Sequence, residues 1–209
     1  PFQNYFFDSL ELSNHKLNQL INKGIQLVEE GILEKIVLAS RFKVKLKYKL
    51  DLIQILKKLK NSQPNTCRYV WKRNSEDIVF GASPEKLFSF SRPNLFLEAI
   101  AGTVSNDLNP NKLLQSSKDI EEHNFVIKYL IECLEVLKII NYKRSPLKVT
   151  SFGDISHLKT LFCANIDYVC PFELLRILHP SPAVCGYPKK DAMNWINTLE
   201  SFSRGNYAS

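Results

Sequence analysis

The sequence predicts an α+β fold in which most strands pair antiparallel. Strand-like runs occur in hairpin groups between helices, which is typical of α+β proteins and unlike a Rossmann-type alternation. A long helical pattern over residues 116–140 follows these runs. The chain has 209 residues, of which 44% are hydrophobic, enough for one sizeable domain with a real core.

The first predicted helix begins at Ser13 or Asn14, either of which can cap it, and Gly31 closes it. Its expected apolar face is Leu17, Leu20, Ile21 and Val28. Residues 34–48 then predict a half-buried strand, because apolar residues alternate with lysines from residue 42 on.

A short helix capped by Asp51 is expected to end near Asn61. Residues 67–73 and 77–82 predict a hairpin around a turn at 74–76, and further strands are expected at 86–90 and 95–101. After the long helix we expect a strand at 147–151, strand or irregular structure up to residue 167, a helix opened by Pro171 and a helix over 189–202.

The long helix carries the most informative carboxylates. Ser116 with Asp119 three residues later is a capping-box pattern, so a helix is expected to start there. Its expected buried face is Glu122, Val126, Tyr129, Cys133 and Leu137. Glu121 then faces solvent, whereas Glu122 points along the buried stripe and needs a partner. That partner can be the helix dipole and backbone, a basic residue or a metal ion.

Composition excludes several classes of protein. The net charge is +7, but the lysines are scattered, so we expect a solvated basic face that helps an anionic substrate approach and no nucleic-acid site. Five cysteines without a Cys-x-x-Cys pair indicate reduced thiols. No apolar run has membrane-spanning length and no signal peptide is visible, so no membrane partner is expected.

Seven segments in order resemble the chorismate-utilising enzymes, which include isochorismate, anthranilate, aminodeoxychorismate and salicylate synthases. The segments are 35–38, 81–85, 101–103, 117–123, 157–158, 179–186 and 202–208. The resemblance implies helix/sheet/sheet/helix layers with two large antiparallel sheets, the fold of anthranilate synthase component I.

Two positions favour isochorismate synthase within this family. Amine-transferring relatives carry glutamine where this chain has Lys35, and a neutral lysine can act as the base that water needs. The segment 179–186 resembles the isochorismate synthase version of that loop, with Ser181 in place of the usual threonine. The alternatives are a salicylate synthase, component I of an anthranilate or aminodeoxychorismate synthase, and a non-catalytic remnant of the family.

The resemblance implies water addition at C2 of chorismate with loss of the C4 hydroxyl. Lys35 would be the base, and Glu85, held protonated by apolar packing around Ala82 and Leu87, would be the acid. Glu122 would hold the cofactor Mg²⁺, which suits a carboxylate combined with waters and substrate oxygens. The residues expected to contact the substrate are Gly102, Thr103, Ala183 and Val184. Taken alone, Lys35 is more typical of a solvated strand lysine, and Glu85 of a turn residue before a strand.

The sequence also departs from the family pattern. Ser40 stands where an arginine is usual, residues 104–106 lack the usual basic side chains, and Ser209 replaces a glycine. Residues 1–209 are interpreted as a partial catalytic domain without the N-terminal half or the C-terminal strands, and this piece alone is expected to be inactive and prone to association. We expect a monomeric full-length enzyme in the cytoplasm, or in the plastid stroma if its origin is plastid.

Overall fold

The computed structural model describes residues 5–10, 14–46, 50–167, 169–205 and 207. The helices are α1 (Asn14–Glu29), α2 (Leu52–Ser62), the 3-10 helix η1 (Pro110–Gln115), α3 (Ser117–Val136), α4 (Pro171–Leu178) and α5 (Lys189–Leu199). The strands are β1 (Tyr5–Leu10), β2 (Lys35–Ile36), β3 (Phe42–Leu46), β4 (Cys67–Lys72), β5 (Ile78–Ser83), β6 (Ser89–Ser91), β7 (Asn94–Ser105), β8 (Tyr142–Arg144), β9 (Lys148–Phe152), β10 (Ile155–Asn165) and β11 (Gly186–Tyr187). Every described strand pair is antiparallel, so the predicted α+β class is confirmed.

The chain divides into two compact units, one made of Pro1–Asp51 with Pro180–Ser209 and the other of Leu52–His179. The second unit is built on a five-stranded sheet. Its order is β6-β7-β10-β8, and β9 also pairs with β10. The central pair is β7 with β10, in register from Asn94 opposite Asn165 to Ser105 opposite Ile155.

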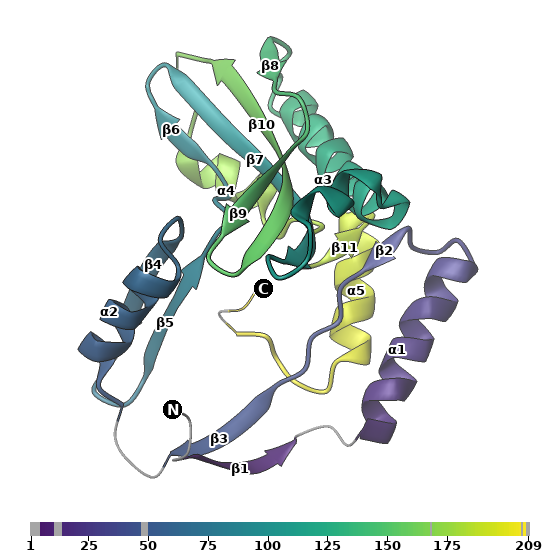
Figure 1. The fold of residues 1–209 in the computed structure, drawn as a ribbon. Helices are drawn as coiled ribbons and strands as arrows, with labels where there is room; N and C mark the ends of the chain where they lie inside the picture. Colours follow the sequence, from purple (N-terminus) through teal and green to yellow (C-terminus); the bar gives the residue numbers. More distant parts are fainter. Residues whose placement is uncertain (1–4, 11–13, 47–49, 168, 206, 208–209) are drawn as a thin grey trace. The chain divides into compact units, whose positions relative to one another are not determined.

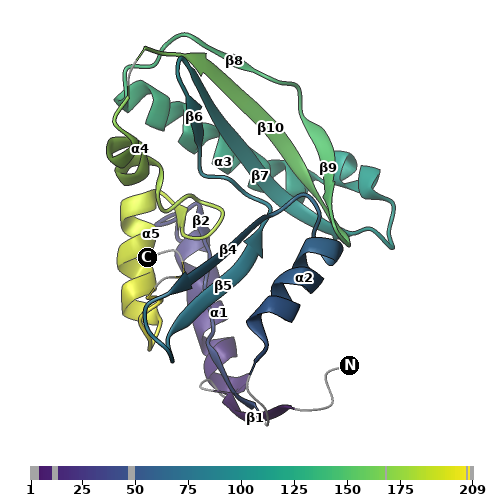
Figure 2. The ribbon, with the colours of Figure 1, turned by 90° about the vertical axis from the view of Figure 1, so that its left-hand side faces the viewer.

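Helix α3 covers one face of this sheet (Figure 1, Figure 2). Because side chains alternate along a strand, every second residue of β10 faces the same way, and Leu158, Thr160 and Phe162 are all nearly fully buried. On the opposite face of β10, Lys159 forms an ion pair with Glu98 of β7 at 2.8 Å. The core of this unit therefore lies between α3 and the sheet.

The boundaries and buried stripe of α3 differ in part from the expectation. Ser116 caps the helix as predicted, since its hydroxyl accepts the Asp119 N–H at 3.2 Å. The helix ends at Val136 instead of Ile140, because Lys138 has a φ of 58° and turns the chain. The buried residues are His123, Val126, Tyr129, Leu130, Cys133 and Leu134. The buried stripe is thus wider than predicted, and it begins at His123, next to the half-buried Glu122.

The predicted hairpin is confirmed as β4 and β5, which pair from Cys67 opposite Ser83 to Lys72 opposite Ile78. The Asn74 side chain accepts the N–H groups of Glu76 and Asp77, which closes the turn. Helix α2 lies alongside this hairpin in both ribbon views (Figure 1, Figure 2).

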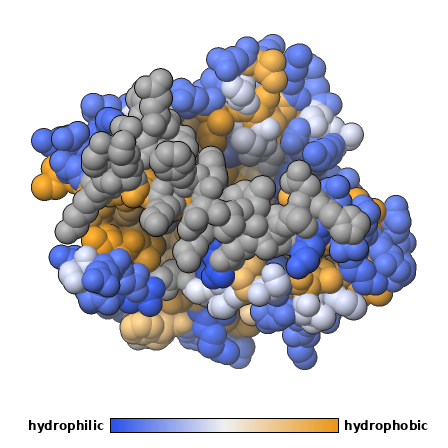
Figure 3. Space-filling view, turned by 90° about the horizontal axis from the view of Figure 1, so that it is seen from below, coloured by the Kyte–Doolittle hydropathy of each residue, from blue (hydrophilic) through white to orange (hydrophobic). Residues whose placement is uncertain are grey.

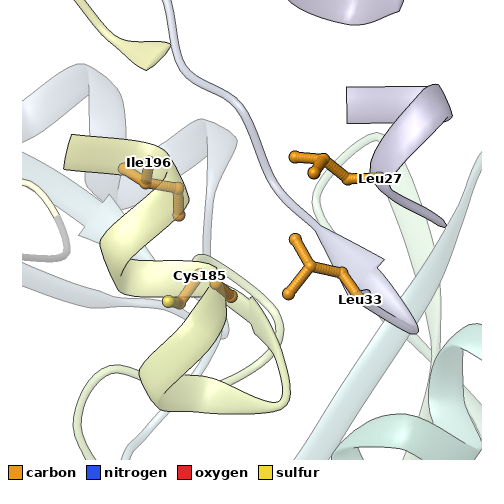
Figure 4. Packing of buried hydrophobic residues seen from close by; sticks show 5 residues of the cluster. Leu27, Leu33, Cys185 and Ile196 are labelled. Carbon is orange, nitrogen blue, oxygen red and sulfur yellow. The ribbon is translucent and has the colours of Figure 1, made fainter. Parts of the chain in front are cut away.

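The first unit has its own small core, where α1, the segment before β2, the segment before β11, and α5 meet. Leu27, Leu33, Cys185 and Ile196 point toward one another there (Figure 4), and Ala192 completes the cluster. The predicted apolar face of α1 is partly wrong. Leu20 and Leu27 are buried, whereas Ile21 and Val28 are 43% and 39% exposed. The proposed cap Ser13 lies outside the described residues.

The predicted strand 34–48 is interrupted. Only Lys35 and Ile36 form β2, residues 37–41 are not strand, and β3 starts at Phe42. The break has a visible cause. The Val37 N–H still donates to the Cys185 carbonyl, but the Ala39 N–H donates to the carboxylate of Glu200 instead of to a strand. Residues 47 and 48 of the predicted strand lie outside the described part of the chain.

Apolar side chains also reach the surface, as the orange areas among hydrophilic ones in Figure 3 show. Phe172 of α4 and Ile140 after α3 are 82% and 78% exposed. All five cysteines are thiols outside any disulfide, as expected. In the part of the chain that the structure describes, no helix combines the length and apolarity needed to cross a membrane.

Candidate functional site

Lys35, the predicted base, lies in the two-residue strand β2 and is half-buried. Its backbone pairs with Tyr187 of β11, and Ile36 pairs with Gly186. The Glu34 N–H donates to the Tyr187 carbonyl and the Val37 N–H to the Cys185 carbonyl, both at 2.8 Å. Backbone hydrogen bonds on both sides of Lys35 therefore fix its place in the first unit.

The predicted substrate-contacting residues Ala183 and Val184 directly precede this ladder and are half-buried. They lie in a tight turn, in which the Ser181 carbonyl accepts the N–H groups of both Val184 and Cys185. The turn continues into β11 through Gly186, whose φ of 145° suits glycine alone. Lys35 thus lies in β2, and residues 183–184 lie just before its antiparallel partner β11.

Gly102 and Thr103 lie in β7 of the second unit, at an irregularity in its pairing with β10. His157 pairs with Thr103 and Leu158 pairs with Ala101, so Gly102 is an extra residue that bulges out of the ladder. Its φ is 72°, and an added Cβ would lie 3.0 Å from the Asp119 Cβ of α3. In this structure the glycine is needed for the bulge and for close packing of α3, a reason that differs from the predicted backbone approach to substrate.

His157 supports this bulge. Its Nδ1 lies 2.9 Å from the Thr103 hydroxyl and 3.1 Å from the Gly102 carbonyl oxygen. Burial lowers the pKa of His157, and the hydrogen bond with the Gly102 carbonyl partly offsets this. The ring therefore holds the two predicted substrate-contacting residues in place as a neutral group, a role that sequence reasoning did not assign.

Glu122, the predicted metal ligand, lies in the second turn of α3 and is half-buried. Its neighbour Glu121 is exposed, as predicted, and the next residue, His123, points into the core. A Cβ added to Gly102 would lie 3.0 Å from the Cβ of Asp119, one turn before Glu122, so the bulge lies close to the start of α3. Among the residues that the structure describes, no three His, Cys, Asp or Glu side chains gather as a metal cluster.

Glu85, the predicted acid, follows β5 and is half-buried. The Ser83 hydroxyl donates to the backbone carbonyl of Glu85 at 3.1 Å, which shapes the turn. Leu87 and Ala82 are also half-buried, which is compatible with the apolar packing predicted around this carboxyl group. Its protonation state stays a prediction.

The altered position Ser40 lies with Arg41 in a hollow of about 390 Å³, which Phe202, Ser203, Arg204 and Tyr207 also line. The Arg41 guanidinium lies 5.2 Å from the centre of the Phe202 ring. Arg204 and Glu200, close by in sequence, form a buried ion pair that sequence reasoning missed. Their spacing of four residues was a weak signal, because it occurs just after a helix has ended.

His123 is a buried titratable group on α3 that sequence reasoning left as structural. Its Nε2 lies 2.9 Å from the Thr160 hydroxyl of β10, and within the described residues its Nδ1 has no hydrogen-bond partner. Because the side chain is only 1% exposed, burial lowers its pKa to about 4. His123 is therefore neutral in the folded protein at neutral pH.

This burial predicts an acid-sensitive stability. Between the ordinary histidine pKa of 6.5 and about 4, the unfolded chain binds a proton that the folded chain does not. The free energy of unfolding should therefore fall as the pH drops through this window, by about 3 kcal/mol from this residue. Denaturant unfolding of the wild type and of His123→Gln from pH 7 to pH 4 measures the difference, and parallel curves would contradict it.

Comparisons with known proteins identify the family of the chain. A family model described as chorismate binding enzyme matches residues 3–209. Isochorismate synthase MenF of Haemophilus influenzae is 28% identical over 200 residues, which are 90% of this chain and 45% of that protein. The chloroplastic isochorismate synthase of Catharanthus roseus is 29% identical over 185 residues, which are 84% of this chain and 32% of that protein.

Solved structures share the fold. The DhbC structure of Bacillus anthracis, by its name a 2,3-dihydroxybenzoate-specific isochorismate synthase, has a TM-score of 0.87 and 25% identity over 98% of this chain and 58% of that one. Anthranilate synthase component I of Streptococcus pneumoniae has a TM-score of 0.84 at 21% identity, over 99% of this chain and 47% of that one, and shows the fold alone.

The chain spans about half the length, or less, of the curated relatives cited above. The family model nonetheless matches nearly all of it, including every segment that carried the resemblance. The predicted α+β fold and the predicted family are confirmed together. The chain belongs to the family of chorismate-binding enzymes.

Proposed function

We propose that the protein, in its full reading frame, is an Mg²⁺-dependent isochorismate synthase. The observation that carries the proposal is Lys35, paired through β2 and β11 to the segment containing Ala183 and Val184. Lysine can act as a base toward water, which an amine-transferring enzyme does not need. The names of several relatives as isochorismate synthases support the same choice.

In the proposed reaction, Lys35 accepts a proton from water as the water oxygen bonds to C2 of chorismate. Both ring double bonds shift and the C4–O bond breaks, while Glu85 gives its proton to the departing hydroxyl. Water is thus consumed at C2 and released at C4, so the product is an isomer of the substrate. Before the reaction starts, the Lys35 amine must be neutral and the Glu85 carboxyl group must be protonated.

Glu122 is compatible with the proposed magnesium ion. It offers carboxylate oxygens near the start of α3, and Mg²⁺ favours one or two carboxylates combined with waters and substrate oxygens. When bound, the ion would neutralise carboxylate charge on the substrate, and Gly102 and Thr103 would contribute backbone and hydroxyl contacts.

The proposal has a direct test. The protein expressed from its full reading frame is incubated with chorismate and Mg²⁺, with and without an ammonium salt, and products are separated by chromatography. Isochorismate as the product supports the proposal. Anthranilate or aminodeoxychorismate formed with ammonium, salicylate with pyruvate, or unchanged chorismate would each replace it with one of the other members of the family or with a non-catalytic protein.

Glu122→Gln is expected to raise the Mg²⁺ concentration that gives half-maximal activity on the order of tenfold or more, since a carboxylate ligand is lost. Glu121→Gln is the matched control, because this exposed neighbour occupies the same turn of α3. Activity and the Mg²⁺-induced rise in melting temperature are both measured. Equal magnesium dependence in the two variants would remove Glu122 from the metal site.

The use of the product is part of the proposal. The names of similar proteins include a vibriobactin-specific isochorismate synthase and a menaquinone-specific one. We therefore propose that this protein supplies isochorismate for naphthoquinones such as menaquinone or phylloquinone, or for a siderophore. The proposed location is the cytoplasm, or the plastid stroma if the gene is of plastid origin.

A further inference from the structure

A buried ion pair links the C-terminal segment to the strand that carries Lys35. The side chains of Arg204 and Glu200 are 5% and 1% exposed. Arg204 Nε donates to one Glu200 carboxylate oxygen at 2.8 Å, and Nη2 donates to the other. This hydrogen bonding to Glu200 raises the pKa of Arg204 further above its ordinary value, so the guanidinium stays charged.

The ion pair also forms hydrogen bonds with the backbone of two other segments, the one after β2 and the one before β11. Arg204 Nη1 donates to the Val184 carbonyl at 2.8 Å, and Nη2 donates to the Val37 carbonyl at 2.7 Å. The Glu200 carboxylate accepts the Ala39 N–H at 2.8 Å. All these residues belong to the first unit.

These contacts lie where the backbone ladder ends. The strands β2 and β11 pair through only two residues each, and an isolated pair this short has little stability of its own. Val37 is two residues after Lys35, and Val184 directly follows Ala183. Hydrogen bonds from the Arg204 side chain therefore continue the β2–β11 ladder just beyond Lys35. They hold the backbone at Val37 and at Val184 at a fixed distance from each other.

Stability alone does not explain this arrangement. A buried ion pair is often no better for stability than apolar residues of the same volume, because both charges lose their hydration. What the pair supplies is direction, since a planar guanidinium with donors on three nitrogens reaches a carboxylate and two carbonyls at once. Lysine cannot reproduce this fork.

We propose that Arg204 and Glu200 are positioning residues that fix the Lys35 strand against the 183–184 segment. The inference rests on the proposed function where it takes Lys35 as the base and Val184 as a neighbour of the substrate. Neither Arg204 nor Glu200 acts on the reacting atoms. Their effect passes through the backbone at Val37, Ala39 and Val184.

The first test is a double-mutant cycle in the full-length protein. Arg204→Lys should lower kcat on the order of tenfold to a hundredfold, because a small misplacement of the base is costly. In the Lys35→Gln background the same change should cost less than about twofold, since the group that it positions is already lost. Full, additive losses in both backgrounds would overturn the proposal, because they indicate a general effect on folding.

A second variant separates position from stability. Arg204→Met combined with Glu200→Leu removes both charges and leaves no unpaired buried ion, so it should stay folded and lose less melting temperature than Glu200→Leu alone, which leaves Arg204 unpaired. Turnover should nevertheless fall as in Arg204→Lys. Arg73→Lys is the matched control, because Arg73 pairs with Asp77 at the surface, where the side chains are 47% and 43% exposed. Wild-type turnover in the apolar double variant would overturn the proposal.

Amide hydrogen exchange gives a readout that does not depend on the reaction. The N–H groups of Val37 and Ala39 should exchange faster in both variants, whereas those of the β7–β10 pair should not change. If the wild type forms no isochorismate, the proposed function fails, and exchange still decides on the ion pair. Unchanged protection at Val37 and Ala39 would show that the pair does not hold this segment.

Discussion

Replacing Lys35 with glutamine in the full reading frame is expected to abolish most water addition and to leave chorismate binding largely intact. A positioned general base contributes roughly 10²–10⁴-fold to the rate, and it acts in the transition state more than in the ground state. The loss should therefore appear in kcat, with little change in the dissociation constant for chorismate. Steady-state kinetics and equilibrium binding of chorismate measure the two quantities.

Two further variants make this result specific to proton transfer. Arginine stays protonated near neutral pH and so cannot accept a proton from water, which means that Lys35→Arg should be about as inactive as Lys35→Gln. Lys148→Gln changes an exposed strand lysine in β9 and should have no effect. Near-normal turnover by Lys35→Gln would remove Lys35 from the mechanism and return the amine-transferring enzymes to consideration.

Among glycine-to-alanine substitutions in the first unit, Gly186→Ala is expected to lower the free energy of unfolding most. An added Cβ would lie 2.4 Å from the Lys35 carbonyl oxygen and 2.9 Å from the Ala192 Cβ, and both atoms are held by packed elements. The φ of 145° adds strain for any residue with a side chain. Together, clash and strain should lower the free energy of unfolding by about 3 kcal/mol or more.

Gly31→Ala is the matched control for this prediction. Gly31 also has a positive φ, of 71°, but a Cβ there would meet nothing within 4 Å. Only backbone strain should then remain, which costs roughly 1–2 kcal/mol. Urea unfolding of both variants gives the comparison, and equal losses would show that the contact with Lys35 is loose. Turnover of Gly186→Ala should fall as well, because the β2–β11 register moves.

Local patterns were sufficient wherever neighbours in sequence decide the structure. The hairpin of β4 and β5 was predictable, because Asn74 favours a turn between two strand-like runs. The start of α3 was predictable for the same reason, since Ser116 caps its own helix. The places of Lys35, Glu85 and Glu122 came from family resemblance, and their catalytic roles stay predictions.

Local patterns were insufficient wherever contacts with a distant segment determine which residues are buried or where a strand ends. On α1, two overlapping apolar stripes are possible, and the one with Leu20 and Leu27 is buried. Gly24 decides this, because the segment 36–38 approaches it so closely that a Cβ would lie 3.0 Å from the Leu38 side chain. Likewise, β2 stops early because Ala39 binds Glu200, which is 161 residues away. No periodicity in either segment contains that information.

The first unit is assembled from the two ends of the described chain, and this has a consequence for the order of folding. Strand β2 cannot pair with β11 until some 150 further residues have been synthesised. Closing so long a loop also has an entropic cost. The second unit is continuous in sequence, so it can fold on the ribosome before β2 has a partner strand. Within these two units, the backbone around Lys35 should thus be among the last parts to become ordered, and any delay in the folding of the second unit would postpone it further.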